Sequence, residues 1–111
     1  MNKVELLAPA GNFSKLKTAI YYGADAVYIG GKNFSLRALS DNFTDDEIAD
    51  AVIYAHARNV KIYVTVNIFA RNNDFEKAAA YFRFLYNAGV DAVLITDIGL
   101  IDLCKEVAPG L

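Results

Sequence analysis

The sequence has little cysteine, proline or glycine: one Cys, two Pro and seven Gly in 111 residues. Because a disulfide needs two thiols, a single Cys104 excludes an internal disulfide and a metal site built from several cysteines of this chain. A lone thiol fits a reducing compartment, and the apolar run before Pro9 is too short for a signal-peptide core or a membrane span. We therefore expect a cytoplasmic protein that does not enter a membrane.

Strong charge is also missing. The net charge is −2, and the eleven basic residues are scattered instead of forming a run, which argues against binding to duplex DNA. Hydrophobic residues make up 55% and charged residues 22%, a composition typical of a globular chain and too apolar for disorder. At this length we expect one small domain, or a piece of a larger one.

Strand-like apolar runs alternate with segments of helical periodicity. The four runs are Val4–Leu7, Ala26–Ile29, Val60–Val66 and Ala92–Ile95. Four successive strand–helix units require parallel strands joined by right-handed crossovers. The fold class predicted for residues 1–111 is therefore α/β.

Start and stop signals mark the helices between these runs. Asn12 is a good N-cap, and Gly23 ends the first helix. Thr44 and Glu47 have the spacing of a capping box for the second, which Asn59 ends in a left-handed conformation. The third helix, which Gly89 ends, has an apolar stripe of Phe75, Ala78, Phe82 and Leu85. The fourth helix has an apolar stripe of Leu100, Leu103, Cys104 and Val107.

The third run indicates which α/β architecture is present. Val60, Ile62, Val64 and Val66 alternate with polar residues, whereas a sheet covered by helices on both faces needs apolar residues on both. Alternation favours a barrel, in which the second face points inward. A pattern repeated at 23–27 and 89–93 fits units related by duplication. We predict four β/α units, half of a TIM-type (β/α)8 barrel.

Four units cannot close such a barrel, because the usual interior needs eight strands. Two alternatives remain open. The chain is the N-terminal half-barrel of a longer protein, or two copies associate as a homodimer that completes the sheet.

Candidate site residues follow from the rule that barrel sites form at the carboxyl ends of the strands. The long second loop has two glycines, which let a ligand approach the backbone, and cations that suit a carboxylate or phosphate. Its alternative interpretation is a solvated surface loop. The predicted ligand-binding residues are Gly30, Gly31, Lys32, Ser35, Arg37 and, at the end of the third strand, Asn67.

Other polar residues have structural explanations. Glu5 and Lys61 face the predicted barrel interior, so we expect a buried ion pair. Asp97 is expected to cap the fourth helix. His56 and Cys104 are expected to be structural, and Asp25 and Asp91 to fix turns at the amino ends of strands. No nucleophile–base pair, metal-ligand motif or phosphate-binding loop occurs, so the catalytic residues stay unknown and no metal site is predicted.

Four blocks of sequence carry a resemblance that covers nearly the whole chain. They are ELLAPAGN (5–12), GADAVYIGGKNFSLRA (23–38), AHARNVKIYVTVN (55–67) and AGVDAVLITDIG (88–99). Together they resemble the N-terminal region of the collagenase-like peptidases of peptidase family U32. The resemblance implies an α/β barrel and, by the family name, a hydrolase acting on peptides.

The same resemblance implies a second activity. Some members resemble oxygen-independent hydroxylation factors for transfer RNA, ribosomal RNA or quinone precursors, which use an iron–sulfur cluster. The cluster cysteines of that group lie beyond the region matched here, so we expect no cofactor in this chain and a cluster only in a longer parent. Three hypotheses follow: a peptidase, the substrate-binding half of an RNA or quinone-precursor hydroxylation factor, and a non-catalytic half-barrel. The corresponding ligands are a peptide, a small anion, or RNA in a longer parent.

Overall fold

The computed structural model describes residues 5–31, 43–66, 74–95, 104–105, 108 and 110. Its strands are β1 (Leu7–Pro9), β2 (Ala26–Gly30), β3 (Lys61–Val66) and β4 (Ala92–Ile95). Its helices are α1 (Phe13–Tyr21), α2 (Asp45–His56) and α3 (Asp74–Ala88). The strands form one parallel sheet in the order β1-β2-β3-β4, which is also their order in the chain.

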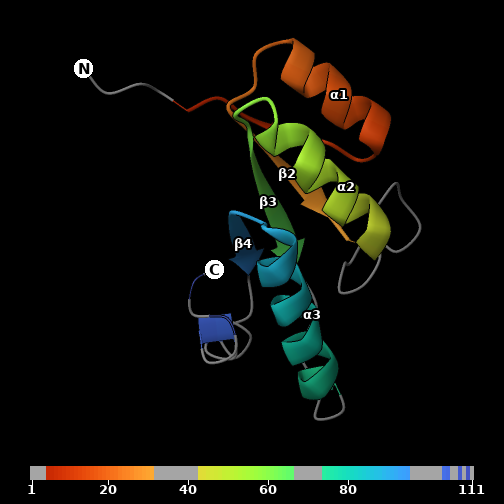
Figure 1. The fold of residues 1–111 in the computed structure, drawn as a ribbon, viewed down its shortest axis with the longest axis vertical. Coiled ribbons are helices and arrows are strands. Elements are labelled where there is room, and N and C mark those ends of the chain that lie inside the picture. Colours follow the sequence, from red (N-terminus) through yellow and green to blue (C-terminus); the bar gives the residue numbers. More distant parts are fainter. Residues whose placement is uncertain are drawn as a thin grey trace.

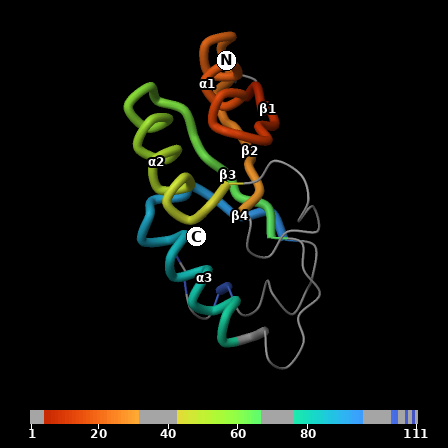
Figure 2. Tube along the Cα trace, turned by 90° about the vertical axis from the view of Figure 1, so that its right-hand side faces the viewer, coloured from red at the N-terminus to blue at the C-terminus, as the bar shows by residue number. Residues whose placement is uncertain are grey.

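The three helices cover one face of this sheet (Figures 1 and 2). A doubly wound sheet reverses its strand order at a switch point and has helices on both faces. Here the order never reverses, so the winding is that of a barrel wall. The predicted α/β fold of parallel strands alternating with helices, arranged as part of a barrel, is confirmed. In the described part of the chain, no helix is both long and apolar enough to cross a bilayer.

The core lies between the sheet and the helices. On β3, Ile62, Val64 and Val66 are fully buried, whereas Lys61 is exposed and Thr65 half-buried, so the predicted alternation is confirmed. The helices cover these side chains with Leu16, Ile48, Ala51, Val52, Ala55, Ala78, Phe82 and Leu85. Burying one such large apolar side chain stabilises the fold by roughly 1.5–3 kcal/mol.

The helix starts follow the predicted caps. Asn12 Oδ1 accepts a hydrogen bond from the Lys15 amide at 2.9 Å. At α2, Thr44 Oγ1 accepts from the Glu47 amide at 3.2 Å, and Glu47 Oε1 accepts from the Thr44 amide at 3.0 Å. Each satisfied cap contributes about 1 kcal/mol to helix stability.

The helix ends also follow the sequence. Gly23 and Gly89 have φ of 97° and 91°, and Asn59 has φ of 59°. These left-handed values disfavour residues with a β-carbon, apart from Asn and Asp, whose short side chains bond locally. The three predicted stops are confirmed.

Asp25 and Asp91 occupy equivalent places where β2 and β4 begin. The Leu6 amide donates to Asp25 Oδ2 at 2.9 Å, while the Asp25 amide donates to the Leu6 carbonyl at 2.8 Å. Likewise, the Ile62 amide donates to Asp91 Oδ2 at 2.7 Å, and the Asp91 amide donates to the Ile62 carbonyl at 2.9 Å. This reciprocal pair explains the repeated sequence pattern, and it confirms that the aspartates fix the strand starts.

The first strand differs from its predicted bounds, because β1 covers Leu7–Pro9 and not Val4–Leu7. Leu6 is engaged by Asp25, so strand pairing begins one residue later, at Leu7 with Ala26. Pro9 is tolerated at the end of this outer strand because its missing N–H removes no ladder bond there. Apolarity therefore located the strand but not its register.

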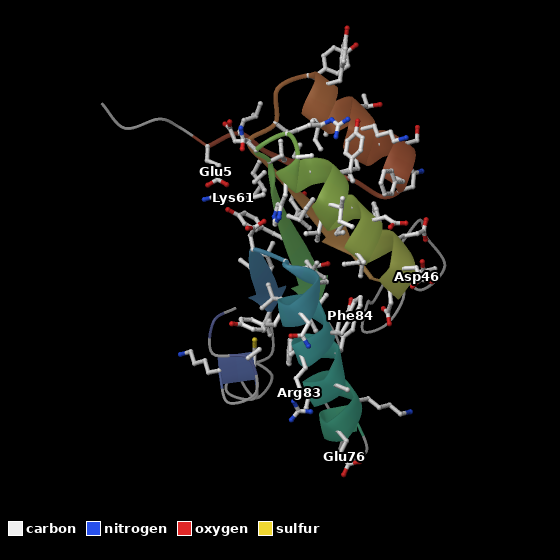
Figure 3. All side chains as sticks on the ribbon, viewed as in Figure 1. Glu5, Asp46, Lys61, Glu76, Arg83 and Phe84 are labelled. Carbon is white, nitrogen blue, oxygen red and sulfur yellow. The ribbon has the colours of Figure 1, made fainter. Side chains whose placement is uncertain are left out.

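The prediction of a buried ion pair between Glu5 and Lys61 is wrong. Both residues are exposed, at the same end of the sheet (Figure 3). Glu5 lies before β1, and its Oε1 accepts a hydrogen bond of 2.7 Å from the Tyr63 hydroxyl. This bond is the largest cause that raises the pKa of Tyr63, because it stabilises the protonated phenol next to a carboxylate.

The fourth helix lies largely outside the described residues. Cys104 is helical and buried, as expected for a core thiol, and its burial raises the pKa of the thiol. The rest of the predicted stripe (Leu100, Leu103, Val107) and the predicted cap Asp97 lie outside the described residues.

Candidate functional site at the carboxyl ends of the strands

The predicted ligand-binding residues fall into two groups. Gly30 ends β2 and Gly31 follows it, at the carboxyl end of the strand where barrel sites form. The other four, Lys32, Ser35, Arg37 and Asn67, lie outside the described residues. The structure therefore describes the two glycines at which the predicted site begins.

The residues on either side of the long second loop, Gly31 and Phe43, pair with each other, and we call this pair the neck. Gly31 and Phe43 pair as a parallel bridge, and the Phe43 amide donates to the Gly30 carbonyl at 2.8 Å. Phe43 is fully buried, with its ring centroid 6.3 Å from that of Phe13. The two residues that flank 32–42 therefore lie side by side at the carboxyl end of β2.

Gly31 is required by the packing at this neck. A β-carbon at this position would overlap the Tyr81 hydroxyl, and it would lie 3.2 Å from Tyr81 Cζ and 3.3 Å from Ile48 Cδ1. The φ of Gly31 is not left-handed, so the requirement is one of space and not of backbone conformation. The missing side chain of Gly31 therefore makes room for Tyr81, and the predicted role of Gly31 in ligand binding stays a prediction.

Tyr81 was missed by sequence reasoning. It projects from α3, is buried, and stacks on Phe84 with ring centroids 6.3 Å apart. Burial strongly raises the pKa of its phenol, so it is neutral at pH 7 and retains its O–H donor. Its place on the apolar stripe with Ala78 and Leu85 was the available signal.

The neighbouring strand contributes Thr65. Thr65 pairs in register with Gly30, and its Oγ1 donates to the Ile29 carbonyl at 3.4 Å. It is half-buried on the face away from the helices. This placement agrees with the prediction that the polar residues of the third strand lie on the face away from the helices; a role for Asn67, two residues later, stays a prediction.

His56 lies at the opposite, amino end of the sheet. Its Nε2 is 2.7 Å from Asp91 Oδ2, the oxygen that also accepts from the Ile62 amide. The His56 and Asp91 side chains are 41% and 29% exposed. This confirms the structural role expected for His56, but its partner was not predicted.

The chemistry available within the chain is limited. In the ranges that the structure describes, no three His, Cys, Asp or Glu side chains gather in a way that could hold a metal ion. The whole sequence has one cysteine, Cys104, which is buried, so it does not fit the several thiolates that an iron–sulfur cluster requires. The cluster implied by the family resemblance would need ligands from outside this sequence.

Known proteins resemble the chain over nearly all its length. A tRNA hydroxylation protein P1 of Bacillus subtilis is 49% identical, over 98% of this chain and 26% of its own length. An uncharacterized protease of Methanocaldococcus jannaschii is 44% identical, over 96% and 26%. The 23S rRNA 5-hydroxycytidine C2501 synthase of Escherichia coli is 40% identical, over 92% and 16%. The chain thus spans 16–26% of the length of these three relatives.

The fold and the family pattern agree. The solved structure of a U32 peptidase superimposes with a TM-score of 0.74 at 14% identity, covering 93% of this chain and 44% of that one. Such low identity supports the fold alone. The model of Peptidase family U32 matches residues 11–111, which include β2, β3, β4 and all three described helices. The chain belongs to peptidase family U32.

Proposed function

We propose that this chain is the substrate-facing N-terminal half-barrel of an RNA hydroxylation factor of the U32 family. The observation that carries the proposal is the similarity, over nearly the full chain, to proteins named for tRNA and 23S rRNA hydroxylation. The ligand face is the carboxyl edge of the sheet, where the neck at Gly31 and Phe43 anchors residues 32–42. Lys32 and Arg37 would bind an anionic group there.

Peptide hydrolysis is the competing proposal, favoured by the family name and by the protease from Methanocaldococcus jannaschii. A serine peptidase of the usual kind needs a base near its nucleophile. The only histidine of the chain, His56, is bound to Asp91 at the amino end of the sheet, whereas the loop containing Ser35 leaves from the carboxyl end. This placement favours RNA modification over a Ser–His mechanism within this chain.

Closure of the barrel is part of the proposal. In the described sheet, β1 and β4 each have one strand neighbour, so each offers an edge. We infer that four further strands complete the wall, supplied by a longer protein or by a second copy. Light scattering on the purified chain distinguishes the two: a stable dimer supports a second copy, and a monomer supports the longer protein.

The proposed function is tested by nucleoside mass spectrometry. Deleting the gene that encodes this sequence should remove a hydroxylated nucleoside from tRNA or 23S rRNA, and the wild-type gene should restore it. The Lys32→Ala/Arg37→Ala variant should not restore it. The control variant Lys77→Ala/Arg83→Ala removes the same charge from the exposed face of α3, and it should restore the nucleoside fully.

Gelatin and unstructured peptides provide the second arm. Unchanged nucleosides after deletion, together with peptide cleavage by the purified protein, would replace the RNA proposal with the peptidase. Cleavage that survives the Ser35→Ala substitution would in turn exclude Ser35 as the nucleophile.

A further inference from the structure

A cluster of aromatic rings and cations lies where α1 packs beside α2. The Phe13 and Tyr54 rings meet edge to face with centroids 5.7 Å apart. Lys17 Nζ lies 5.4 Å from the Phe13 centroid and 5.6 Å from that of Tyr54. On the same Tyr54 ring, Arg58 Cζ lies 3.7 Å from the centroid. Lys17 and Arg58 therefore both lie over the Tyr54 ring.

This cluster is basic in a chain whose net charge is negative. The segment 12–22 contains two lysines and no acidic residue. Arg58 Nη1 donates to the Tyr54 carbonyl at 2.9 Å, and within the described residues no ion pair with an acidic side chain is identified for Arg58 or Lys17. Of the acidic residues of α2, Asp50 lies one turn before Tyr54 on the same side of the helix, and those at 45–47 lie about two turns or more before it.

Ring contacts do not neutralise the two positive charges. A cation–π contact at an exposed site stabilises by only about 0.5–1 kcal/mol, so it leaves the charge of each exposed cation able to bind an anion. A phosphate beside Lys17 or Arg58 would form a charge-assisted contact that the rings do not supply.

Two exposed tyrosines extend the cluster along α1. Tyr21 and Tyr22 are 83% and 77% exposed, and their rings meet edge to face with centroids 5.3 Å apart. Tyr21 is four residues after Lys17, so both lie on one side of the helix. Unpaired bases stack on aromatic side chains of this kind, next to cations that bind the phosphates.

We propose that these six residues, hereafter the α1–α2 patch, bind an unpaired segment of RNA: Phe13, Lys17, Tyr21, Tyr22, Tyr54 and Arg58. Lys17 and Arg58 bind phosphates, and Tyr21 and Tyr22 stack on bases. The choice of RNA rests on the proposed function, but the patch itself is a separate site. Tyr21 and Tyr22 end α1 beside the amino ends of the strands, away from the neck at Gly31 (Figure 1). The patch therefore holds RNA remote from the nucleotide that is modified.

Fluorescence anisotropy with a labelled unstructured RNA and with a tRNA transcript tests the patch over a series of salt concentrations. Lys17→Gln/Arg58→Gln keeps part of each side chain and removes both charges. It should weaken RNA binding about tenfold and reduce the salt slope by about 1.4, the value for two single-strand phosphate contacts. The matched control Lys77→Gln/Arg83→Gln removes two exposed charges from α3 and should change affinity less than about twofold.

A second variant tests base stacking without removing charge. Tyr21→Ser/Tyr22→Ser alters two exposed side chains, so the fold should persist, as checked by circular dichroism. It should weaken binding about fivefold or more and leave the salt slope unchanged.

Three results would overturn the inference: no binding of either RNA by the wild-type chain, equal losses in the α1–α2 and α3 charge variants, or tighter binding to anionic lipid vesicles than to RNA. Each of these leaves the nucleoside test of the proposed function intact. Conversely, RNA binding through the patch without loss of a hydroxylated nucleoside on gene deletion would preserve the patch and overturn the proposed function.

Discussion

At the amino end of the sheet, aspartate carboxylates bind backbone amides of neighbouring strands, whereas at the carboxyl end a tyrosine from a helix packs against a glycine. The first arrangement satisfies polar groups locally, at Asp25 and again at Asp91. The second fixes only the two ends of residues 32–42, through Gly31 and Phe43. Local hydrogen bonds therefore hold the amino end of the half-barrel, whereas side-chain packing fixes the base of the loop that is predicted to bind a ligand at the carboxyl end.

The contact at the carboxyl end should give the largest effect. Gly31→Ala forces a methyl group into the Tyr81 hydroxyl, and overpacking of this kind costs about 1–3 kcal/mol of unfolding free energy. Tyr81→Phe removes the overlapping oxygen, so the double variant should recover part of the loss. Chemical denaturation of the four proteins in the cycle measures this coupling. Equal losses for Gly31→Ala in both backgrounds would contradict the proposed contact.

The two aspartates should differ, although they make the same hydrogen bonds to backbone amides and carbonyls. Asp91→Ala leaves the amide of the fully buried Ile62 without its side-chain acceptor, at a cost of about 2 kcal/mol. Asp25→Ala exposes the Leu6 amide, which water can reach, so we expect about 1 kcal/mol. Thermal or urea unfolding gives both values. A larger loss of unfolding free energy in Asp25→Ala than in Asp91→Ala would mean that burial of the amide does not determine the cost of losing its acceptor.

The His56 contact at the amino end should contribute less. Both side chains are partly exposed, so His56→Gln should cost about 0.5 kcal/mol, and less at high salt. In an Asp91→Ala background the same substitution should cost almost nothing. A full loss in that background would mean that His56 acts through another neighbour.

The smallest effect concerns Tyr63 and Glu5. Because the raised pKa of Tyr63 comes first from its bond to Glu5, Glu5→Gln should shift this pKa down, towards the ordinary phenol value. The folded state holds the proton more tightly, so the stabilisation is complete below the ordinary phenol pKa and is lost as the pH rises through the folded value. NMR of labelled tyrosine follows the titration. An unchanged pKa in Glu5→Gln would contradict this origin.

Local features were predictable from the sequence. The caps at Asn12 and Thr44 and the stops at Gly23 and Asn59 depend on residues within one turn, so a short pattern identifies them. The alternation on β3 was equally visible, because it reflects two faces with different surroundings.

Contacts between distant segments were not predictable in the same way. His56 and Asp91 are 35 residues apart, and their meeting depends on how α2 packs against the sheet. The role of Gly31 depends on Tyr81 in another helix, so the sequence alone suggested a ligand there. The buried pair of Glu5 and Lys61 was wrong because Glu5 lies before β1 and both residues are exposed. The ligand roles of Gly30, Gly31, Lys32, Ser35, Arg37 and Asn67 stay predictions.

The strand order of the sheet bears on how the chain folds. Every strand pairs with its neighbour in sequence, so each new strand can pair with the edge of the strand synthesised before it. Contacts of short sequence separation close small loops and form quickly. Folding can then proceed one β/α unit at a time, because each added strand becomes the edge with which the following strand pairs. In the described sheet, β4 presents the edge to which a fifth strand would add.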